Sequence, residues 1–382
     1  MWTWTQAANV IFIEQPAGVG FSYSETPSDY TVGDYQASQD VLQFMLGFLE
    51  RYPQYATRSF YLSGESYGGH YVPSFANAIV RSNLAGVNPK INIQGFIAGN
   101  AWTVAELDNI GAITYWYTRT MIDNATYNGI LSTCNMSDVG PLLAKQTRDE
   151  SDWEVSQGIK APPRPLGFTP LLDSITGKAK VSSDLDCDGW TNQGFNLLSG
   201  IDIYDSFSDV CTVSSSSSSV SSSLRTGSNN NAGCAIDYDP CRDGKTTTYL
   251  NDPQVKSLIH ANASIVWTGC SDIVDYSRFD LLSSMLPTYQ FLISQGLRIS
   301  VYSGDVDAIV PTVGTREWIN ALGVNEVVPI RAWTVNGQVG GWTTQYKELN
   351  FTTIRNAGHF VPEMQGERAL KFFKSFLNNE PL

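Results

Sequence analysis

Apolar and polar side chains recur along this chain with two periods, one typical of helices and one typical of strands. Residues 91–99 alternate in character as the two faces of a strand do, whereas residues 41–49 space apolar side chains as an amphipathic helix does. Similar runs predict further strands at 9–14, 59–63, 297–307, 327–333 and 349–353, and further helices at 71–80 and 369–377. Strands that alternate with helices predict an α/β fold, with a mostly parallel sheet covered by helices on both faces.

This rhythm breaks between residues 103 and 245. The stretch holds five of the six cysteines, a Pro162-Pro163 pair and a serine-rich run at 214–223. We predict that residues 1–102 and 246–382 form the α/β core, and that 103–245 form an inserted cap over the active site. The serine-rich run has the low complexity of a loop.

Composition narrows the choice of partners. The chain has 382 residues, of which 42% are hydrophobic, enough to bury the core of one large unit. Its net charge of −13 argues against nucleic acid and anionic membrane surfaces as partners. No apolar run is long enough to span a membrane, so we expect no integral membrane association.

The most informative motif is the G-x-S-x-G pentapeptide at residues 64–68. It lies between the predicted strand 59–63 and the predicted helix 71–80, which is the context of a nucleophile elbow. A chance match is the alternative in a chain with 32 glycines, but the flanking pattern disfavours it. Ser66 is therefore the candidate nucleophile, and we expect the glycines to relieve crowding and unusual backbone angles in the turn.

Three histidines are candidates for the base that a serine nucleophile requires. His70 lies in the helix after the elbow, where we expect a buried, hydrogen-bonded side chain. His260 follows a helical stretch, where the helix dipole explains it. His359 lies in a loop bounded by glycine and proline before the last helix, where a hydrolase fold presents its base. We therefore assign the role of base to His359, and we expect its Nε2 to lie within hydrogen-bond reach of Ser66 Oγ.

A carboxylate must orient that imidazole, and the predicted strand 297–307 ends in two acids, Asp305 and Asp307. Both lie at the carboxyl end of a strand, the edge where α/β sheets place their sites. Either acid, with Ser66 and His359, gives the Ser–Asp–His chain order of α/β-hydrolases. The residues alone leave the choice open.

Three blocks resemble those of the serine carboxypeptidases: GESYGGHYVP at 64–73, SGDVDAIVP at 303–311 and GHFVP at 358–362. The resemblance runs from residue 2 nearly to the end and is weakest at 140–235. It implies an α/β-hydrolase fold and the release of C-terminal residues from peptides or proteins through an acyl-enzyme, with no metal or other cofactor. It also implies that Asp307 is the catalytic acid and that the Tyr67 N–H is an oxyanion donor.

The same resemblance gives Glu65 and Tyr67 roles in substrate binding. In the family, a glutamate before the nucleophile belongs to a carboxyl pair that holds the substrate's terminal carboxylate while at least one group is protonated. Crowded acids share protons because two close negative charges are costly. We therefore expect an acidic working pH. Glu65 also suits the start of a helix, where an acid interacts favourably with the helix dipole, and both explanations can hold.

The start of the chain departs from the family pattern. Family members carry an upstream Gly-Gly-Pro-Gly-Cys-Ser-Ser block that supplies a second oxyanion donor, and no such block occurs here. We therefore expect the first strands of the fold to be missing, an apolar strand edge or face to be uncovered near residues 9–14 or the neighbouring strand, and the oxyanion hole to be half built. The loss of one oxyanion donor costs roughly 10²–10³ in turnover.

Cysteines and sequons together suggest an oxidising secretory compartment, with the protein secreted or vacuolar. The disulfide candidates and the N-glycosylation sites are Cys134, Cys187, Cys211, Cys234 and Cys241, and Asn124, Asn135, Asn262 and Asn350. Spacing does not determine the pairing, but we favour Cys211 with Cys241, which flank the serine-rich run. The resemblance implies that Cys270 is a free thiol, because its family partner lies in the absent block.

Three functions compete at this point: a carboxypeptidase, an acyltransferase or esterase on the same scaffold, and an inactive truncated remnant. Glu65 favours the first over the second, because an ester has no free carboxylate to hold. The absent upstream block favours the third. The side-chain preference and the oligomeric state are not predicted by these patterns.

Overall fold

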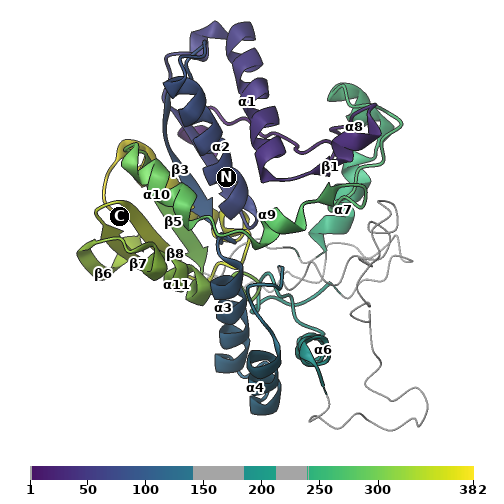
Figure 1. Ribbon diagram of the computed structural model, residues 1–382, viewed down its shortest axis with the longest axis vertical. Helices are drawn as coiled ribbons and strands as arrows, with labels where there is room; N and C mark the ends of the chain where they lie inside the picture. The colour runs from purple at the N-terminus through teal and green to yellow at the C-terminus, as the bar shows by residue number, and fades with distance from the viewer. Residues whose placement is uncertain (1, 141–184, 212–238, 240) are drawn as a thin grey trace.

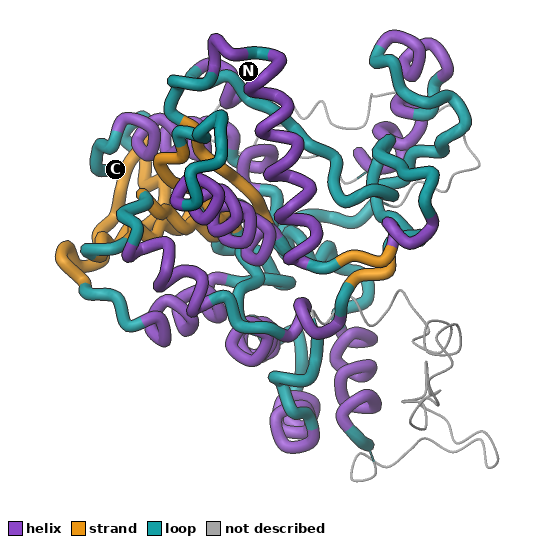
Figure 2. Tube along the Cα trace, turned by 45° about the horizontal axis from the view of Figure 1, so that its top comes forward, coloured by secondary structure: helices purple, strands orange, loops and turns teal. Residues whose placement is uncertain are grey.

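The computed structural model describes residues 2–140, 185–211, 239 and 241–382. The serine-rich run and Cys234 lie outside the described residues. Figures 1 and 2 show one central sheet with helices packed against it and a group of helices that extends away from it.

The central sheet has six strands in the order β2-β3-β5-β8-β7-β6. The strands β2, β3, β5 and β8 are parallel, and β7 and β6 complete the sheet in antiparallel pairing. Their bounds are Phe60–Glu65 (β2), Ile93–Gly99 (β3), Arg298–Gly304 (β5), Glu326–Val335 (β6), Gln338–Tyr346 (β7) and Leu349–Ile354 (β8). The predicted mostly parallel sheet is confirmed.

The sequence patterns missed strand β7. It forms a hairpin with β6 through Asn336 and Gly337, which both have positive φ, at 49° and 75°. An Asn-Gly pair between two strand-like runs is a strong signal for a tight hairpin turn, so this strand was detectable. Its alternation is hidden by Gly340 and Gly341 near its start.

The strand predicted at residues 9–14 is wrong. This segment has no regular structure, and Phe12 is 90% exposed. An isolated extended run needs a neighbouring strand to satisfy its backbone groups, and among the described residues β2 pairs only with β3. A hollow of about 1710 Å³ lies beside this edge, between β2, the apolar face of α1 (Asp34–Arg51) and residues 2–13. The expected uncovered apolar edge is therefore observed at β2.

Helices cover both faces of the sheet, as predicted. Adjacent strand residues such as Phe96 and Ile97 point to opposite faces and join different clusters. Helices α2 (Gly68–Leu84), α10 (Leu286–Ser294) and α11 (Thr312–Leu322) pack on the Phe96 face. Helix α13 (Gly366–Asn378) packs on the Ile97 face through Phe372, Phe373 and Phe376. Helix α1 packs against α2, and Figure 1 shows the two side by side.

Helices α3 (Ala105–Thr118), α4 (Asn124–Thr133) and α6 (Cys187–Leu197) share a separate apolar cluster. The Trp116 indole donates to the Ala308 carbonyl at 2.7 Å, which joins this cluster to the loop after β5. The division of the chain at residues 103 and 245 stays a prediction. Among the described helices, none is both long and apolar enough to cross a membrane.

The remaining elements are short. They are the 3-10 helices Trp4–Gln6, Pro27–Tyr30 and Pro53–Tyr55, the parallel strand pair β1 (Thr31–Val32) and β4 (Asp275–Tyr276), and the helices α7 (Arg242–Leu250), α8 (Pro253–Leu258), α9 (Arg278–Leu282) and α12 (Val361–Met364).

Two disulfides join Cys134 to Cys187 and Cys211 to Cys241. The second is the pair that the sequence analysis favoured. Cys270 is a free, exposed thiol in the structure, as the family resemblance implied.

We expect the Cys134–Cys187 bond to contribute strongly to stability, because it closes a loop across 53 residues. Replacing both cysteines by serine should lower the free energy of unfolding by about 2–4 kcal/mol, measured by chemical denaturation. Cys270→Ser is the matched control and should change that free energy by less than about 0.5 kcal/mol. Equal stability of the double variant and the control would contradict the expectation.

Candidate active site

Ser66 lies at the sharp turn between β2 and α2, so the predicted strand–turn–helix is confirmed. Its φ is 62°, in the left-handed region that few residues other than glycine adopt. Three backbone hydrogen bonds hold it there. The Ser66 N–H donates to Gly99 at 3.0 Å, and the Ser66 carbonyl accepts from Gly69 and Trp102, each at 2.9 Å.

The glycines of the motif play unequal parts in this turn. A Cβ at Gly64 would lie 2.6 Å from Cγ2 of Val72, whereas a Cβ at Gly68 would meet its nearest neighbour only at 4.0 Å. The expectation of crowding on both sides of the serine is therefore correct for Gly64 and wrong for Gly68. The unusual backbone angle belongs to Ser66 itself.

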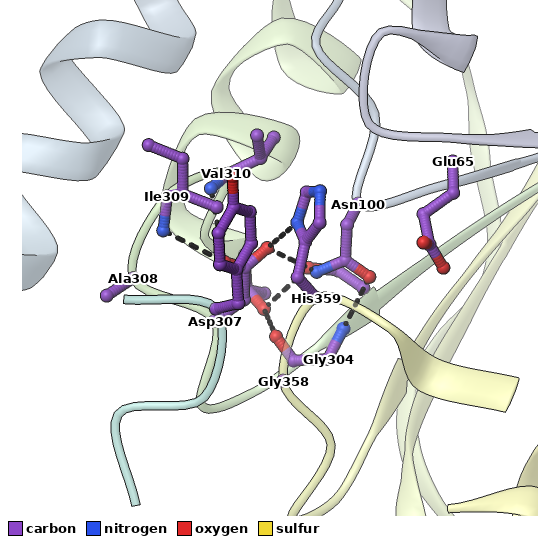
Figure 3. A network of polar contacts seen from close by, with 12 residues as sticks. Glu65, Asn100, Gly304, Asp307, Ala308, Ile309, Val310, Gly358 and His359 are labelled. Carbon is purple, nitrogen blue, oxygen red and sulfur yellow. Dashed lines mark hydrogen bonds and ion pairs between the residues drawn. The ribbon is translucent and has the colours of Figure 1, made fainter. Parts of the chain in front are cut away.

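His359 and Asp307 form a buried pair. His359 Nδ1 lies 2.7 Å from Asp307 Oδ2, and both side chains are almost fully excluded from solvent (Figure 3). Asp305 has another partner: its Oδ1 accepts from the backbone N–H of Asn356 at 2.6 Å, at the start of the histidine loop. The sequence left open which acid is the partner of the base. In the structure Asp307 lies beside the His359 imidazole, whereas Asp305 supports the loop that carries His359.

Asn100 is a site residue that the sequence analysis missed. Its Nδ2 donates to Asp307 Oδ2 at 2.7 Å, and its Oδ1 accepts from the Gly304 N–H at 3.2 Å (Figure 3). The backbone N–H groups of Ile309 and Val310 donate to the other oxygen, Oδ1 of Asp307. The signal for Asn100 was its position, since it directly follows β3 at the carboxyl edge of the sheet.

The other two histidines lie away from this pair, as predicted. His70 is fully buried in α2, with Nδ1 2.9 Å from Asp34 Oδ2. His260 is exposed just beyond the end of α8.

The predicted cap reaches the histidine loop. The backbone N–H of His359 donates to the Tyr204 carbonyl at 2.6 Å, and the two rings lie 5.3 Å apart. Residues on either side of Tyr204 also bond the acid loop, since Ala308 N–H donates to Ile203 and Ser206 N–H donates to Val306.

The reactive groups of Ser66 and Tyr67 are uncommitted within the described part of the chain. The Ser66 hydroxyl makes no hydrogen bond there, so the expected Ser66–His359 hydrogen bond is not present in this structure. Contacts of this kind are often long without substrate and tighten when it binds. The Tyr67 N–H also donates to no described residue, which leaves it free for a ligand oxygen.

Glu65 and His359 have shifted pKa values that depend on each other. Burial raises the pKa of Glu65 to about 7, while the positive charge of His359 opposes the rise. Burial lowers the pKa of His359, but the Asp307 carboxylate outweighs it, with help from Glu65, so the pKa lies above its ordinary value. The Tyr302 hydroxyl donates to Glu65 Oε2 at 3.4 Å. The raised pKa of Glu65 therefore arises first from burial, and the negative charge of Asp307 raises it further.

Arg242 is a second residue that the sequence analysis missed. It begins α7 directly after the disulfide-bonded Cys241, forms an ion pair with Glu363, and places its guanidinium 5.0 Å from the Phe360 ring centroid. Its positive charge lowers the pKa of Glu65 and so acts on the site. No group of three side chains suited to hold a metal ion occurs in the described ranges.

A family model described as serine carboxypeptidase matches residues 1–379. The chain belongs to the serine carboxypeptidase family. Serine carboxypeptidase-like 26 of Arabidopsis thaliana is 37% identical over 385 residues, which cover 100% of this chain and 74% of the relative. Serine carboxypeptidase 24 of the same plant is 36% identical over 386 residues, which cover 99% of this chain and 74% of the relative.

Solved structures show the same fold. Kex1ΔP, a prohormone-processing carboxypeptidase from Saccharomyces cerevisiae, superimposes with a TM-score of 0.66 over 99% of this chain and 75% of its own. At 18% identity this likeness concerns the fold alone. Together with the sheet described above, it identifies the α/β-hydrolase fold that the sequence predicted.

We predict that Asn100→Ala will both destabilise the fold and slow turnover. The change leaves the buried Gly304 N–H without its acceptor and removes a donor from Asp307. An unsatisfied buried group of this kind costs about 1–3 kcal/mol, measurable by chemical denaturation. Hydrolysis of a blocked dipeptide should fall as well, because Asp307 orients His359. Asn128→Ala on the exposed side of α4 is the control, and unchanged stability and turnover in Asn100→Ala would refute this account.

Proposed function

We propose that this member of the serine carboxypeptidase family removes C-terminal residues from peptides or proteins through an acyl-enzyme. The observation that carries the proposal is the buried Asp307–His359 pair at the carboxyl edge of the sheet that also presents Ser66. The same edge holds Glu65, a carboxyl group whose pKa of about 7 lets it carry a proton at mildly acidic pH.

In the proposed reaction, Ser66 Oγ attacks the carbonyl of the last peptide bond while His359 Nε2 takes its proton. Asp307 holds the imidazole through Nδ1 and stabilises its positive charge. His359 then gives the proton to the leaving amino acid, so the peptide C–N bond breaks and an ester to Ser66 remains. Water, activated by His359, hydrolyses that ester and restores the hydroxyl.

The oxyanion formed in each step needs hydrogen-bond donors that are already in position. The backbone N–H of Tyr67 follows the nucleophile and has no acceptor among the described residues, which supports this role. One such donor is worth roughly 10²–10³ in turnover.

Glu65 is suited to recognise the free carboxylate of the substrate. When protonated it donates a hydrogen bond to that carboxylate, and when ionised it repels it. The positive charge of Arg242 also acts at this position. This arrangement favours substrates with a free terminal carboxylate over esters that lack one.

Two titrations limit the pH range in opposite directions. Substrate binding weakens as pH rises through about 7, because Glu65 then loses its proton. Proton transfer weakens as pH falls through the raised pKa of His359, because the base is then already protonated. The molecules that bind substrate are those in which Glu65 is protonated. In them the negative charge of Glu65 no longer raises the pKa of His359, so His359 stays neutral down to a lower pH than it does beside an ionised Glu65. We therefore propose a mildly acidic working range.

A secretory location is supported by the two disulfides, which form in oxidising compartments. The proposed glycosylation sites Asn124, Asn135 and Asn350 are exposed and Asn262 is half-buried, so the structure leaves them accessible to modification.

The first test replaces the nucleophile. Ser66→Ala should abolish hydrolysis of a blocked dipeptide with a free C-terminus, and a fluorophosphonate probe should no longer label the chain. Ser63→Ala, which changes an exposed serine in β2, is the matched control and should keep both activities. Near-normal hydrolysis by Ser66→Ala would overturn the proposed function.

The second test concerns the coupled carboxyl group. Glu65→Gln removes a negative charge that raises the pKa of His359, so the acid limb of kcat/KM should move to lower pH. The loss of binding through about pH 7 should flatten on the alkaline side, because no carboxylate forms. Glu317→Gln on α11 controls for an unspecific change of charge. An unaltered profile in Glu65→Gln would remove Glu65 from carboxylate recognition.

A further inference from the structure

A second buried cluster of polar groups lies beneath the nucleophile turn. Its centre is Asp34, the first residue of α1, whose carboxylate is buried. Asp34 Oδ1 accepts from the hydroxyl groups of Tyr67 at 3.1 Å and Tyr276 at 2.6 Å. Its Oδ2 lies 2.9 Å from His70 Nδ1. One carboxylate thus joins α1, α2 and the strand β4.

Tyr67 is held on several sides by this cluster. Its ring stacks on His70 at a centroid distance of 4.7 Å and meets Tyr71 and Tyr276 edge-on at 5.0 and 5.4 Å. Burial, reinforced by the charge of Asp34, drives the pKa values of the Tyr67 and Tyr276 hydroxyls far above their ordinary value. Both hydroxyls therefore remain protonated donors to Asp34 at every working pH.

Asp34 itself is held in place through its backbone, by a residue outside the cluster. Its backbone N–H donates to Asp280 Oδ2 at 2.9 Å, so the carboxylate cannot simply follow a moving tyrosine. The anchor of the Tyr67 side chain is thus a buried carboxylate and not a surface group, and its partner Tyr276 packs against the apolar cluster that α1 shares with α2.

We propose that Asp34 is a positioning residue for catalysis, which fixes Tyr67 so that its backbone N–H points at the developing oxyanion. This inference rests on the proposed function. Tyr67 directly follows Ser66, whose positive φ leaves the peptide between them dependent on its surroundings for its orientation. The hydrogen bond from the Tyr67 hydroxyl to Asp34 and the stacking of its ring on His70 restrict rotation of Tyr67. A donor acts on the oxyanion only when it is already aligned, so a looser Tyr67 loses transition-state stabilisation before it loses substrate binding.

The test uses variants of the full chain that separate the tether from the rest of the cluster. Tyr67→Phe removes only the hydroxyl, and Asp34→Ala removes the acceptor. Asp34→Asn keeps an oxygen that can accept from Tyr67, so it should restore part of the activity lost in Asp34→Ala. Asp40→Ala, on the exposed side of the same helix, is the control for substitution of an acid in α1.

We expect kcat to fall roughly 10–10²-fold in Tyr67→Phe and Asp34→Ala, somewhat less than the loss of a whole oxyanion donor, with KM changed by less than about twofold. The double variant should be no slower than Asp34→Ala alone, because both changes break the same contact. Asp40→Ala should match the unaltered chain.

Two inhibitors give a readout that a merely structural role would not move. A peptide aldehyde adds to Ser66 Oγ and places its oxygen at the oxyanion position, whereas the matching peptide alcohol cannot add. The inhibition constant of the aldehyde should rise by the same factor as kcat/KM falls, and that of the alcohol should stay constant.

Equal weakening of both inhibitors would overturn the inference, as would unchanged kcat in the folded Tyr67→Phe variant. If Ser66→Ala retains hydrolysis, the proposed function fails; if Ser66→Ala is inactive and the aldehyde is unaffected, only the role of Asp34 fails.

Discussion

The left-handed backbone of Ser66 is the constraint on which the site depends. A non-glycine residue at such an angle costs on the order of 1–3 kcal/mol, so it persists only where the surroundings impose it. Here the surroundings are the neighbouring strand β3, the first turn of α2 and Trp102, all bonded to the Ser66 backbone. Strand β3 therefore contributes to the site as well as β2, because its hydrogen bond to the Ser66 N–H helps to hold the turn in the shape that exposes the hydroxyl.

The carboxyl edge of the sheet collects polar groups from separate parts of the chain. Asn100 follows β3, Asp307 follows β5, and His359 follows β8, and these strands are neighbours in the sheet. Parallel pairing aligns the carboxyl ends of these strands, so residues far apart in sequence meet at one edge of the sheet. The buried Asp307 is satisfied mostly by groups of this edge, which explains how a carboxylate remains in a core without solvent.

Local motifs made most of the fold and the principal candidates predictable, and the failures have physical reasons. Ser66, His359 and the two acids stand in short segments whose own pattern reveals the turn or strand end. Asn100 has no such pattern, because its importance arises from contact with Asp307 across the sheet. The segment 9–14 has strand-like composition, yet a strand exists only with a partner, which sequence pattern alone does not supply. The shifted pKa of Glu65 was foreseen in direction, but its main cause, burial, depends on tertiary packing.

The disulfide between Cys211 and Cys241 ends one residue before Arg242, whose charge reaches Glu65. The covalent bond therefore restrains the start of α7, which carries the cation that acts on the acid we assign to substrate recognition. Formation of the disulfide and the pKa of Glu65 are consequently linked, because the bonded Cys241 is the neighbour of Arg242 in the chain. In a chain whose thiols remained reduced, Arg242 would lose this covalent restraint, and the positive charge that lowers the pKa of Glu65 would be less firmly placed.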